Sequence, residues 1–211
     1  MKLSNFEIQV SKEHYFKEYT TKKRWICYWH QIDEVLKTKP KKILEIGIGN
    51  KTVSDYLKNQ NIKITTVDID KNLKPDYVCS VTDLSKYLKE KSFDTVLCAE
   101  VLEHLPFEYF EKSLKEIKRV TKNYAIISLP YVCINFRFSF KFPLFKQKKI
   151  FIQMPLYKKH EFDGEHYWEI GKKKYPLNKI KKIIQKYFLI EKNYLVWEHP
   201  YNMFFILKVK K

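Results

Sequence analysis

The chain has 211 residues, of which 45% are hydrophobic, so it can form one domain with a substantial core and is not of the disordered class. Its net charge is +17, and residues 136–211 carry 18 basic but only 6 acidic side chains, which favours an anionic partner for this third of the chain. Four cysteines without metal or redox spacing, and uncharged stretches of at most 14 residues, argue against a disulfide scaffold and a membrane span and predict a cytoplasmic protein.

Residues 11–38 have apolar side chains at helical spacing and are followed by Pro40, so we expect one helix there. From Ile43 onward, short apolar runs alternate with amphipathic segments. The expected strands are 43–47, 62–68, 77–81, 93–99 and 124–129, and the expected helical segments are 52–59, 84–88 and 107–121. This alternation is typical of an α/β fold, in which helices cover both faces of a parallel sheet.

The alternation ends after Tyr131. In residues 134–160 phenylalanines alternate with polar side chains, which predicts strands. A helix is expected from Pro176, followed by an antiparallel strand pair at 188–197 and 203–209. We therefore divide the single domain of residues 1–211 into a helical cap (1–40), a cofactor-binding core (41–131), an acceptor-side insertion (132–175), and a last helix with a strand pair (176–211).

The chain has only four glycines, and two of them, Gly47 and Gly49, stand between a predicted strand and a predicted helix. Glycine at this point lets the backbone approach a ligand closely, and the helix N-terminus offers free N–H groups. Glu45 precedes the first glycine, and Asp68 ends the next strand, where an acceptor can bind ribose hydroxyls. A nicotinamide-dependent oxidoreductase would have a third glycine where Thr52 stands, so that reading is the weaker one.

Four segments in order, Leu44–Gly49, Val67–Asp70, Val81–Leu84 and Phe93–His104, resemble the successive motifs of class I S-adenosylmethionine-dependent methyltransferases. The resemblance covers about residues 40–131. It implies a Rossmann-like three-layer α/β/α sandwich whose seven-stranded, mostly parallel sheet has an antiparallel last strand. It also implies S-adenosyl-L-methionine as cofactor and S-adenosyl-L-homocysteine as product.

The resemblance also implies roles for single residues. Glu45 would contact the methionine amino group beside the backbone of Gly47 and Gly49. Asp68 would bind the ribose hydroxyls, and Ile69 would pack on the adenine. The remaining expected cofactor contacts are the adenine ligands Asp83 and Leu84, and Glu100 beside the methionine part. Lys51 departs from the small residue that the family often has at its position.

Two places are candidates for the acceptor side. His104 follows the fourth predicted strand, where many members of the family present a residue to the substrate. The segment His160–Gly171 reads HEFDGEHYWEIG and mixes acids, histidines and aromatic rings without a helical or strand period. Loops at this edge of the sheet bind ligands, so we expect acceptor contacts from it. The candidate catalytic residues are His104, Glu165 and His166, and the candidate substrate-binding residues are Tyr131, Tyr167, Trp168 and Glu169. The alternative is a structural plug in which Trp168 belongs to the core.

The acceptor itself cannot be named from the sequence. The fourth strand ends in Ala99-Glu100-Val101, which lacks the Asn/Asp-Pro-Pro-aromatic segment of many amino-group methyltransferases, and the cysteines lack the contexts of RNA cytosine-C5 enzymes. A small-molecule, saccharide or lipid-linked acceptor is therefore favoured. The basic and aromatic insertion leaves open an RNA methyltransferase, or a protein that binds nucleic acid or an anionic membrane surface on a methyltransferase scaffold. The favoured interpretation of the insertion is a hairpin that buries one face of phenylalanines. The spacing within His160–His166 matches no metal pattern, so no metal is expected.

Overall fold

The structure is a computed structural model that describes residues 8–17, 19–141, 143–144, 146–156 and 158–210. The helices are α1 (Lys12–Lys17), α2 (Lys22–Lys37), α3 (Thr52–Lys58), α4 (Phe110–Val120) and α5 (Leu177–Gln185). The strands are β1 (Lys42–Ile46), β2 (Lys63–Asp68), β3 (Tyr77–Val78), β4 (Phe93–Ala99), β5 (Thr121–Pro130), β6 (Cys133–Phe140), β7 (Lys148–Pro155), β8 (Phe188–Leu195) and β9 (Asn202–Val209). Short 3₁₀ turns cover Lys71–Leu73, Val81–Lys86, Leu102–His104 and Phe107–Tyr109.

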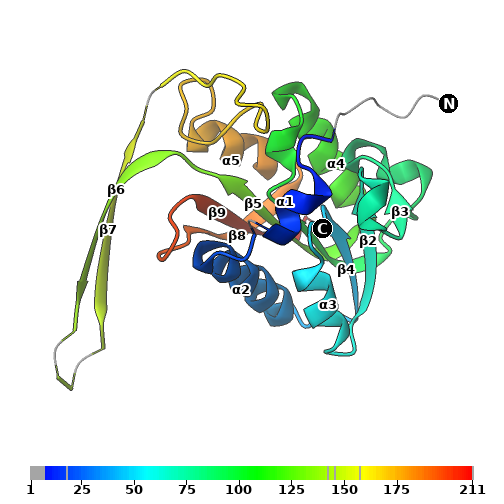
Figure 1. Cartoon of the computed structure of the whole chain (residues 1–211), viewed down its shortest axis with the longest axis horizontal. Coiled ribbons are helices and arrows are strands. Elements are labelled where there is room, and N and C mark those ends of the chain that lie inside the picture. The colour runs from blue at the N-terminus through cyan, green and yellow to red at the C-terminus, as the bar shows by residue number, and fades with distance from the viewer. Residues whose placement is uncertain (1–7, 18, 142, 145, 157, 211) are drawn as a thin grey trace.

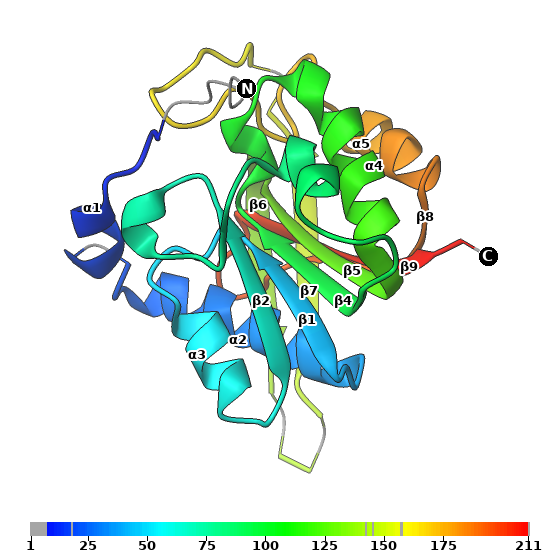
Figure 2. The ribbon, with the colours of Figure 1, turned by 90° about the vertical axis from the view of Figure 1, so that its right-hand side faces the viewer.

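Seven strands form one twisted sheet in the order β3-β2-β1-β4-β5-β9-β8. The first five run parallel, and β9 pairs antiparallel with both β5 and β8. Helices α2 and α3 cover one face, and α4 and α5 cover the other (Figure 1, Figure 2). The predicted three-layer α/β fold with an antiparallel last strand is confirmed.

Successive side chains of the central strands point to opposite faces, and both faces are buried. Leu44 and Val96 join the core beneath α4 and α5, whereas Ile43 and Leu97 join the core beneath α2 and α3. All four are at most 1% exposed. The continuous apolar runs in the sequence therefore correctly predict parallel strands that are buried on both faces.

The predicted helix at 11–38 is two helices instead of one. Thr21 is the N-cap of α2, where its side chain accepts a hydrogen bond from the Arg24 backbone N–H at 3.4 Å. A threonine in that role has extended backbone angles, so the chain turns before α2 begins. The turn places α1 away from α2 and beside the glycine loop after β1, as the contact between Tyr15 and Gly49 shows.

Strands β6 and β7 form a separate two-stranded sheet that projects from the body (Figure 1). This hairpin corresponds to the β-rich part of the predicted insertion. Within the described part of the chain, no helix is both long enough and apolar enough to cross a membrane.

Candidate functional site

The loop after β1 has a backbone that ordinary residues adopt rarely. Gly47 has φ +77° and Gly49 has φ +47°, both in the left-handed region. A Cβ at Gly47 would overlap Cγ2 of Val101, and a Cβ at Gly49 would touch the Tyr15 ring at 3.4 Å. The two glycines therefore let the loop pass close to its neighbours while it turns towards α3.

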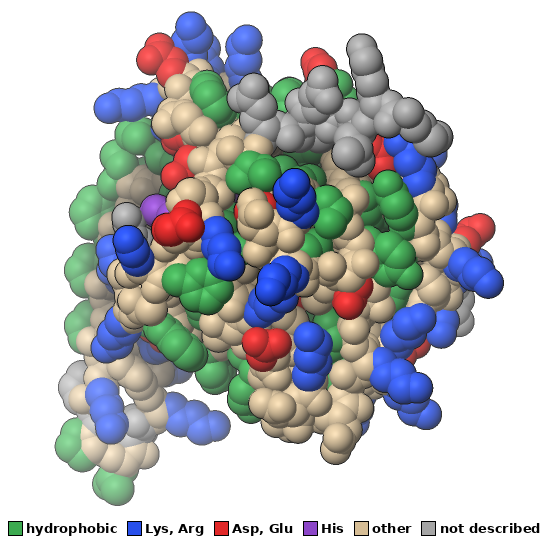
Figure 3. Space-filling model, turned by 45° about the vertical axis from the view of Figure 1, so that its right-hand side comes forward, with side chains coloured by type: hydrophobic (Ala, Val, Ile, Leu, Met, Phe, Trp, Pro, Cys, Tyr) green, Lys and Arg blue, Asp and Glu red, His purple; other side chains and the backbone are tan. Residues whose placement is uncertain are grey.

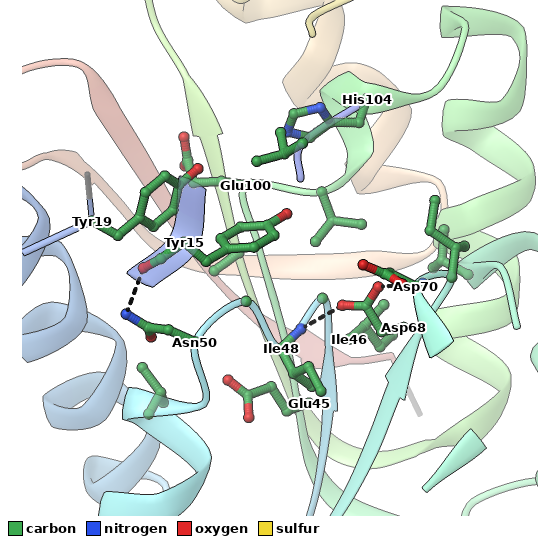
Figure 4. A pocket seen from close by; sticks show the side chains of 18 of the residues that line it. Tyr15, Tyr19, Glu45, Ile46, Ile48, Asn50, Asp68, Asp70, Glu100 and His104 are labelled. Carbon is green, nitrogen blue, oxygen red and sulfur yellow. Dashed lines mark hydrogen bonds between the residues drawn. The ribbon is translucent and has the colours of Figure 1, made fainter. Parts of the chain in front are cut away.

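Asp68, at the end of β2, holds this loop in place. Its Oδ2 accepts a hydrogen bond from the Ile48 N–H at 2.9 Å, and its Oδ1 accepts one from the Asp70 N–H at 2.9 Å (Figure 4). Burial raises the pKa of Asp68, and these two backbone donors oppose the shift. The carboxylate is fixed at the edge of the sheet, beside the half-exposed Ile69.

Glu45 lies beneath the same loop and is 5% exposed. Burial raises its pKa to about 8, and a hydrogen bond with Ser54 opposes the shift. Among the described residues, its Oε2 has no hydrogen-bond partner. A buried carboxyl group with an unused acceptor is costly unless a ligand completes it.

A pocket opens at the carboxyl ends of β1, β2 and β4 and encloses about 140 Å³. Seven of the predicted site residues line it: Glu45, Gly47, Gly49, Asp68, Ile69, Glu100 and His104. They come from three strands and the turns that follow them, and Figure 4 shows several of them around one hollow. The topology of the sheet thus brings together residues that lie far apart in the sequence.

The predicted adenine contacts are an exception. Asp83 faces Lys86 at 3.1 Å and Lys112 at 3.8 Å, and Leu84 is fully buried in the core. Neither lines the pocket; Ser80 and Val81 do. The reason is the 3₁₀ turn at Val81–Lys86, which Ser80 caps and which carries Asp83 round towards the two lysines. We therefore add Ser80 and Val81 to the candidate cofactor contacts, and Asp83 and Leu84 stay predictions.

Glu100 follows β4 with φ +53°, a strained value for a residue with a side chain. Its N–H donates to the Ser128 carbonyl at 3.1 Å, and its Oε1 accepts from the Ser128 hydroxyl at 2.7 Å. These bonds hold the carboxylate at the wall of the pocket. The strained backbone and the place in the pocket lining make this turn a candidate functional feature.

The acceptor-side loop, residues 160–171, is fastened to the turn at Leu102–His104. The Glu103 carbonyl accepts from the Tyr167 N–H at 2.9 Å, and His104 Nδ1 lies 3.0 Å from the Glu165 carbonyl. The indole N–H of Trp168 donates to the Leu105 carbonyl at 3.1 Å. His104 and His166 are thereby brought to a ring separation of 5.0 Å.

His166 and Glu169 form a polar cluster behind His104. Glu169 Oε1 lies 3.2 Å from His166 Nδ1 and accepts from the Tyr201 hydroxyl at 2.7 Å. Burial lowers the pKa of His166, but the hydrogen bond to Glu169 and the Glu103 charge outweigh it and raise the pKa to about 9. Burial, with the His166 charge, lowers the pKa of His104 to about 4. At neutral pH these pKa values make His104 neutral and His166 protonated. A protonated His166 is poorly suited to act as a base.

The other predicted acceptor residues differ in their surroundings. Trp168 is fully buried and packs against Phe107 and Phe110, and Tyr131 is 5% exposed in the same core. Neither lines the pocket, so the structural-plug alternative describes Trp168. Glu165 is partly exposed, Tyr167 is 38% exposed, and Glu169 is buried in its cluster.

The sequence reasoning missed the cover of the pocket. Gln9, Tyr15, Tyr19 and Arg24, from the N-terminal segment, line it on the side opposite the sheet. Gln9 donates from its amide to the His104 carbonyl at 3.1 Å, and the Arg24 guanidinium lies 3.8 Å from the centre of the Tyr19 ring. The aromatic residues at 15 and 19 were visible in the sequence but matched a helical stripe equally well.

Comparisons with known proteins identify the domain and its fold. A family profile described as a methyltransferase domain matches residues 44–129. A comparison with curated protein sequences gives no match.

Solved structures share the fold at low identity. The 1,6-didemethyltoxoflavin-N1-methyltransferase of Burkholderia thailandensis is 13% identical, with a TM-score of 0.62 over 94% of this chain and 85% of that one. The N-methyltransferase NodS of Bradyrhizobium japonicum WM9 is 9% identical, with a TM-score of 0.62 over 91% and 90%. The glycopeptide N-methyltransferase MtfA is 9% identical, with a TM-score of 0.55 over 86% and 89%. All three structures contain S-adenosylhomocysteine. The chain therefore carries a methyltransferase domain at residues 44–129 and shares its fold with these S-adenosylmethionine-dependent methyltransferases.

Proposed function

We propose that the chain binds S-adenosylmethionine in the pocket at the ends of β1, β2 and β4 and transfers its methyl group to a small-molecule, saccharide or lipid-linked acceptor. The observation that carries the proposal is the unused oxygen of Glu45, buried beside the left-handed Gly47–Gly49 loop. An ammonium group of a ligand would complete that carboxylate. The residues present therefore fit an amino acid and nucleoside ligand.

Each pocket residue has a part in holding the cofactor. Glu45 would bind the methionine amino group, and Asp68, already oriented by two backbone N–H groups, would accept from the ribose hydroxyls. Ile69 offers an apolar surface to the adenine, with Ser80 and Val81 at its edge. Glu100 would lie beside the methionine part. The cofactor supplies a methyl group activated on a sulfonium sulfur, so the protein has to align the partners and exclude water.

The cover of the pocket supports a small acceptor group. The N-terminal segment closes one side of the pocket, and the Gln9 bond to His104 fixes it there. His104 lies at the wall of the pocket, where its ring can contact the acceptor. The related structures named above include enzymes for a small heterocycle and for a glycopeptide, which is consistent with such an acceptor. In this proposal residues 1–40 act as the cap, 41–131 hold the cofactor, 132–175 supply the acceptor side, and 176–211 complete the sheet.

Calorimetry with S-adenosylhomocysteine tests the cofactor assignment. We expect the wild type to bind one molecule per chain and Asp68→Ala to bind at least tenfold more weakly, because it loses a charge-assisted hydrogen bond worth roughly 1.5–3 kcal/mol. Asp55→Ala is the matched control, since that carboxylate is exposed on α3 and lies outside the pocket. Circular dichroism checks that each variant is folded. Equal affinities for the wild type and Asp68→Ala would contradict the assignment.

A further inference from the structure

Three side chains lie close together on the side of the pocket where we expect the acceptor to bind. Glu103, His104 and His166 each offer a ligand atom, and these three atoms lie within 4.8 Å of one another. Glu103 and His104 come from the turn after β4, and His166 comes from the loop at 160–171. The backbone bonds between turn and loop hold the three in place.

Glu103 is the side chain that needs an explanation. It is fully buried, and neither of its carboxylate oxygens has a hydrogen-bond partner among the described residues. Burial and the neighbouring charge of Glu100 raise the pKa of Glu103 well above its ordinary value. A buried carboxyl group without a partner is costly, and a cation between it and the two histidines would remove that cost.

The two histidines are oriented as metal ligands are. His104 Nδ1 lies 3.0 Å from the Glu165 carbonyl, which can only accept, so Nδ1 carries the proton and Nε2 keeps its lone pair. His166 Nδ1 lies 3.2 Å from Glu169 Oε1, and Tyr201 and Lys172 hold that carboxylate in turn. In metal sites the second ring nitrogen of a histidine makes such a bond to a carbonyl or carboxylate.

We propose that Glu103, His104 and His166 bind a divalent first-row transition-metal ion. Two imidazole nitrogens and one carboxylate oxygen suit Zn²⁺, Mn²⁺ or Fe²⁺ and leave coordination positions open. Because His104 also lines the pocket, the ion would lie next to the part of the pocket where we expect the acceptor to bind. The spacing within His160–His166 gave no sign of this site because two of the three ligands come from another part of the chain.

The test is a titration with Co²⁺ of full-length protein that has been freed of metal with a chelator. We expect visible absorption bands that saturate at one ion per chain, and a rise in the melting temperature as Co²⁺ is added. Glu103→Gln and His166→Gln should each weaken Co²⁺ binding at least tenfold. His199→Gln is the matched control, because this partly buried histidine lies outside the cluster.

Two results would overturn the metal site. One is the absence of stoichiometric Co²⁺ binding by the wild type; the other is unchanged binding in both variants. If Glu103→Gln does not fold, His104→Gln replaces it in the comparison. The S-adenosylhomocysteine titration is done on the chelator-treated protein, so failure of the metal site and failure of the proposed function are separate outcomes.

The hairpin carries a second inference from an independent observation. In the β6–β7 register, one face carries Lys148 at its end and seven apolar side chains that are each 43–50% exposed: Ile134, Phe136, Phe138, Phe140, Ile150, Ile152 and Met154. On the other face, Arg137 donates to the Trp197 carbonyl at 2.7 Å, and the Phe151 ring lies 5.6 Å from Trp197. The body of the protein therefore holds one face of the hairpin and leaves the apolar face outward.

The charge of the hairpin limits which partners its apolar face can bind. Residues 133–155 contain five basic and no acidic side chains: Arg137, Lys141, Lys146, Lys148 and Lys149. Figure 3 shows hydrophobic and basic side chains along this projecting part at the left of the view. A second copy would bring the same positive segment and be repelled. Four of the seven apolar side chains are aliphatic and do not stack on bases, so the face as a whole suits the apolar part of a bilayer better than a single-stranded nucleic acid.

We propose that the hairpin docks this face on a bilayer that contains anionic phospholipid. Apolar side chains would enter the interface while the lysines near the turn meet the headgroups. We expect the full chain to sediment with vesicles of phosphatidylcholine and phosphatidylglycerol at least tenfold better than with phosphatidylcholine alone, and less well at high salt. Phe136→Ser/Phe138→Ser should reduce this binding about tenfold or more, whereas the control Trp29→Ser, an exposed ring on α2, should not.

Vesicle binding that does not depend on anionic lipid, or that the double variant retains, would overturn the membrane assignment. So would a dimer that the double variant abolishes, because the face would then belong to a second copy. Binding of single-stranded RNA that competes with the vesicles and needs the same phenylalanines would also count against it.

Discussion

Glu45 is a carboxylic acid that is almost fully buried at the base of the pocket. Because burial raises its folded-state pKa to about 8, the folded chain binds more protons than the unfolded chain between the ordinary glutamate pKa and 8. Its contribution to stability is therefore complete below about pH 4.5 and is lost as the pH rises through 8.

We predict that Glu45→Gln removes this pH dependence. In the absence of cofactor, the wild type should lose up to roughly 4 kcal/mol of unfolding free energy across that range through Glu45, and the variant should not. Urea unfolding at pH 5, 6, 7 and 8 measures the difference. A difference between the two proteins that stays constant with pH would contradict the buried, protonated state.

Gly47 tests the close approach of the loop to β4. Gly47→Ala combines a left-handed backbone with an overlap on Val101, so we expect it to cost about 1–3 kcal/mol and to weaken S-adenosylhomocysteine binding. Gly164→Ala is the control, because its φ is +98° but nothing lies within 4 Å of the added Cβ. If thermal or urea unfolding shows equal losses for the two variants, the overlap on Val101 has no energetic role.

At the residue scale, the sequence predicted the pocket residues that lie at the ends of strands. Glu45, Gly47, Gly49 and Asp68 lie at strand ends, where their place follows from the strand pattern. Asp83 did not follow from it, because the direction of a side chain in a 3₁₀ turn depends on a cap, here Ser80, that shifts the chain by a few residues. The position of His166 beside Glu103 could not be predicted either, since His166 lies on a loop that is distant in sequence.

At the scale of elements, apolar pattern was enough to place the strands, because burial on both faces leaves a continuous hydrophobic run. It did not show the break between α1 and α2, where Thr21 starts a new helix within a helical stripe. It also placed the fifth strand at Tyr124, although β5 begins at Thr121, because polar residues at 121–123 hide the start of a strand that pairs with β4.

The loop at 160–171 is held to the body by Trp168, and this can be measured. Trp168→Ala removes a fully buried ring and its hydrogen bond to Leu105, so we expect a loss of about 3–5 kcal/mol of unfolding free energy. Tyr167→Ala, at the partly exposed neighbour, should cost under about 1 kcal/mol. The reverse order in urea unfolding would mean that Tyr167, and not Trp168, anchors the loop.

At the scale of the whole molecule, the sequence could not predict which segments that are distant in the chain lie together in the fold. The N-terminal segment covers the pocket, and the loop at 160–171 closes on the turn after β4. Gln9 and Trp168 each contribute a hydrogen bond to a backbone carbonyl in these contacts, and such partners leave no pattern in the sequence. The hairpin contributes five of the 41 basic residues and no acidic one, so it is a locally positive part of a positively charged chain.

The most direct test of the cofactor site is a crystal structure of the full chain with S-adenosylhomocysteine. The account predicts that the ribose hydroxyls lie within hydrogen-bond distance of the Asp68 carboxylate, that the ligand amino group lies near Glu45, and that Ser80 and Val81 border the adenine. A ligand bound away from the Gly47–Gly49 loop, or no bound ligand at saturating concentration, would contradict it.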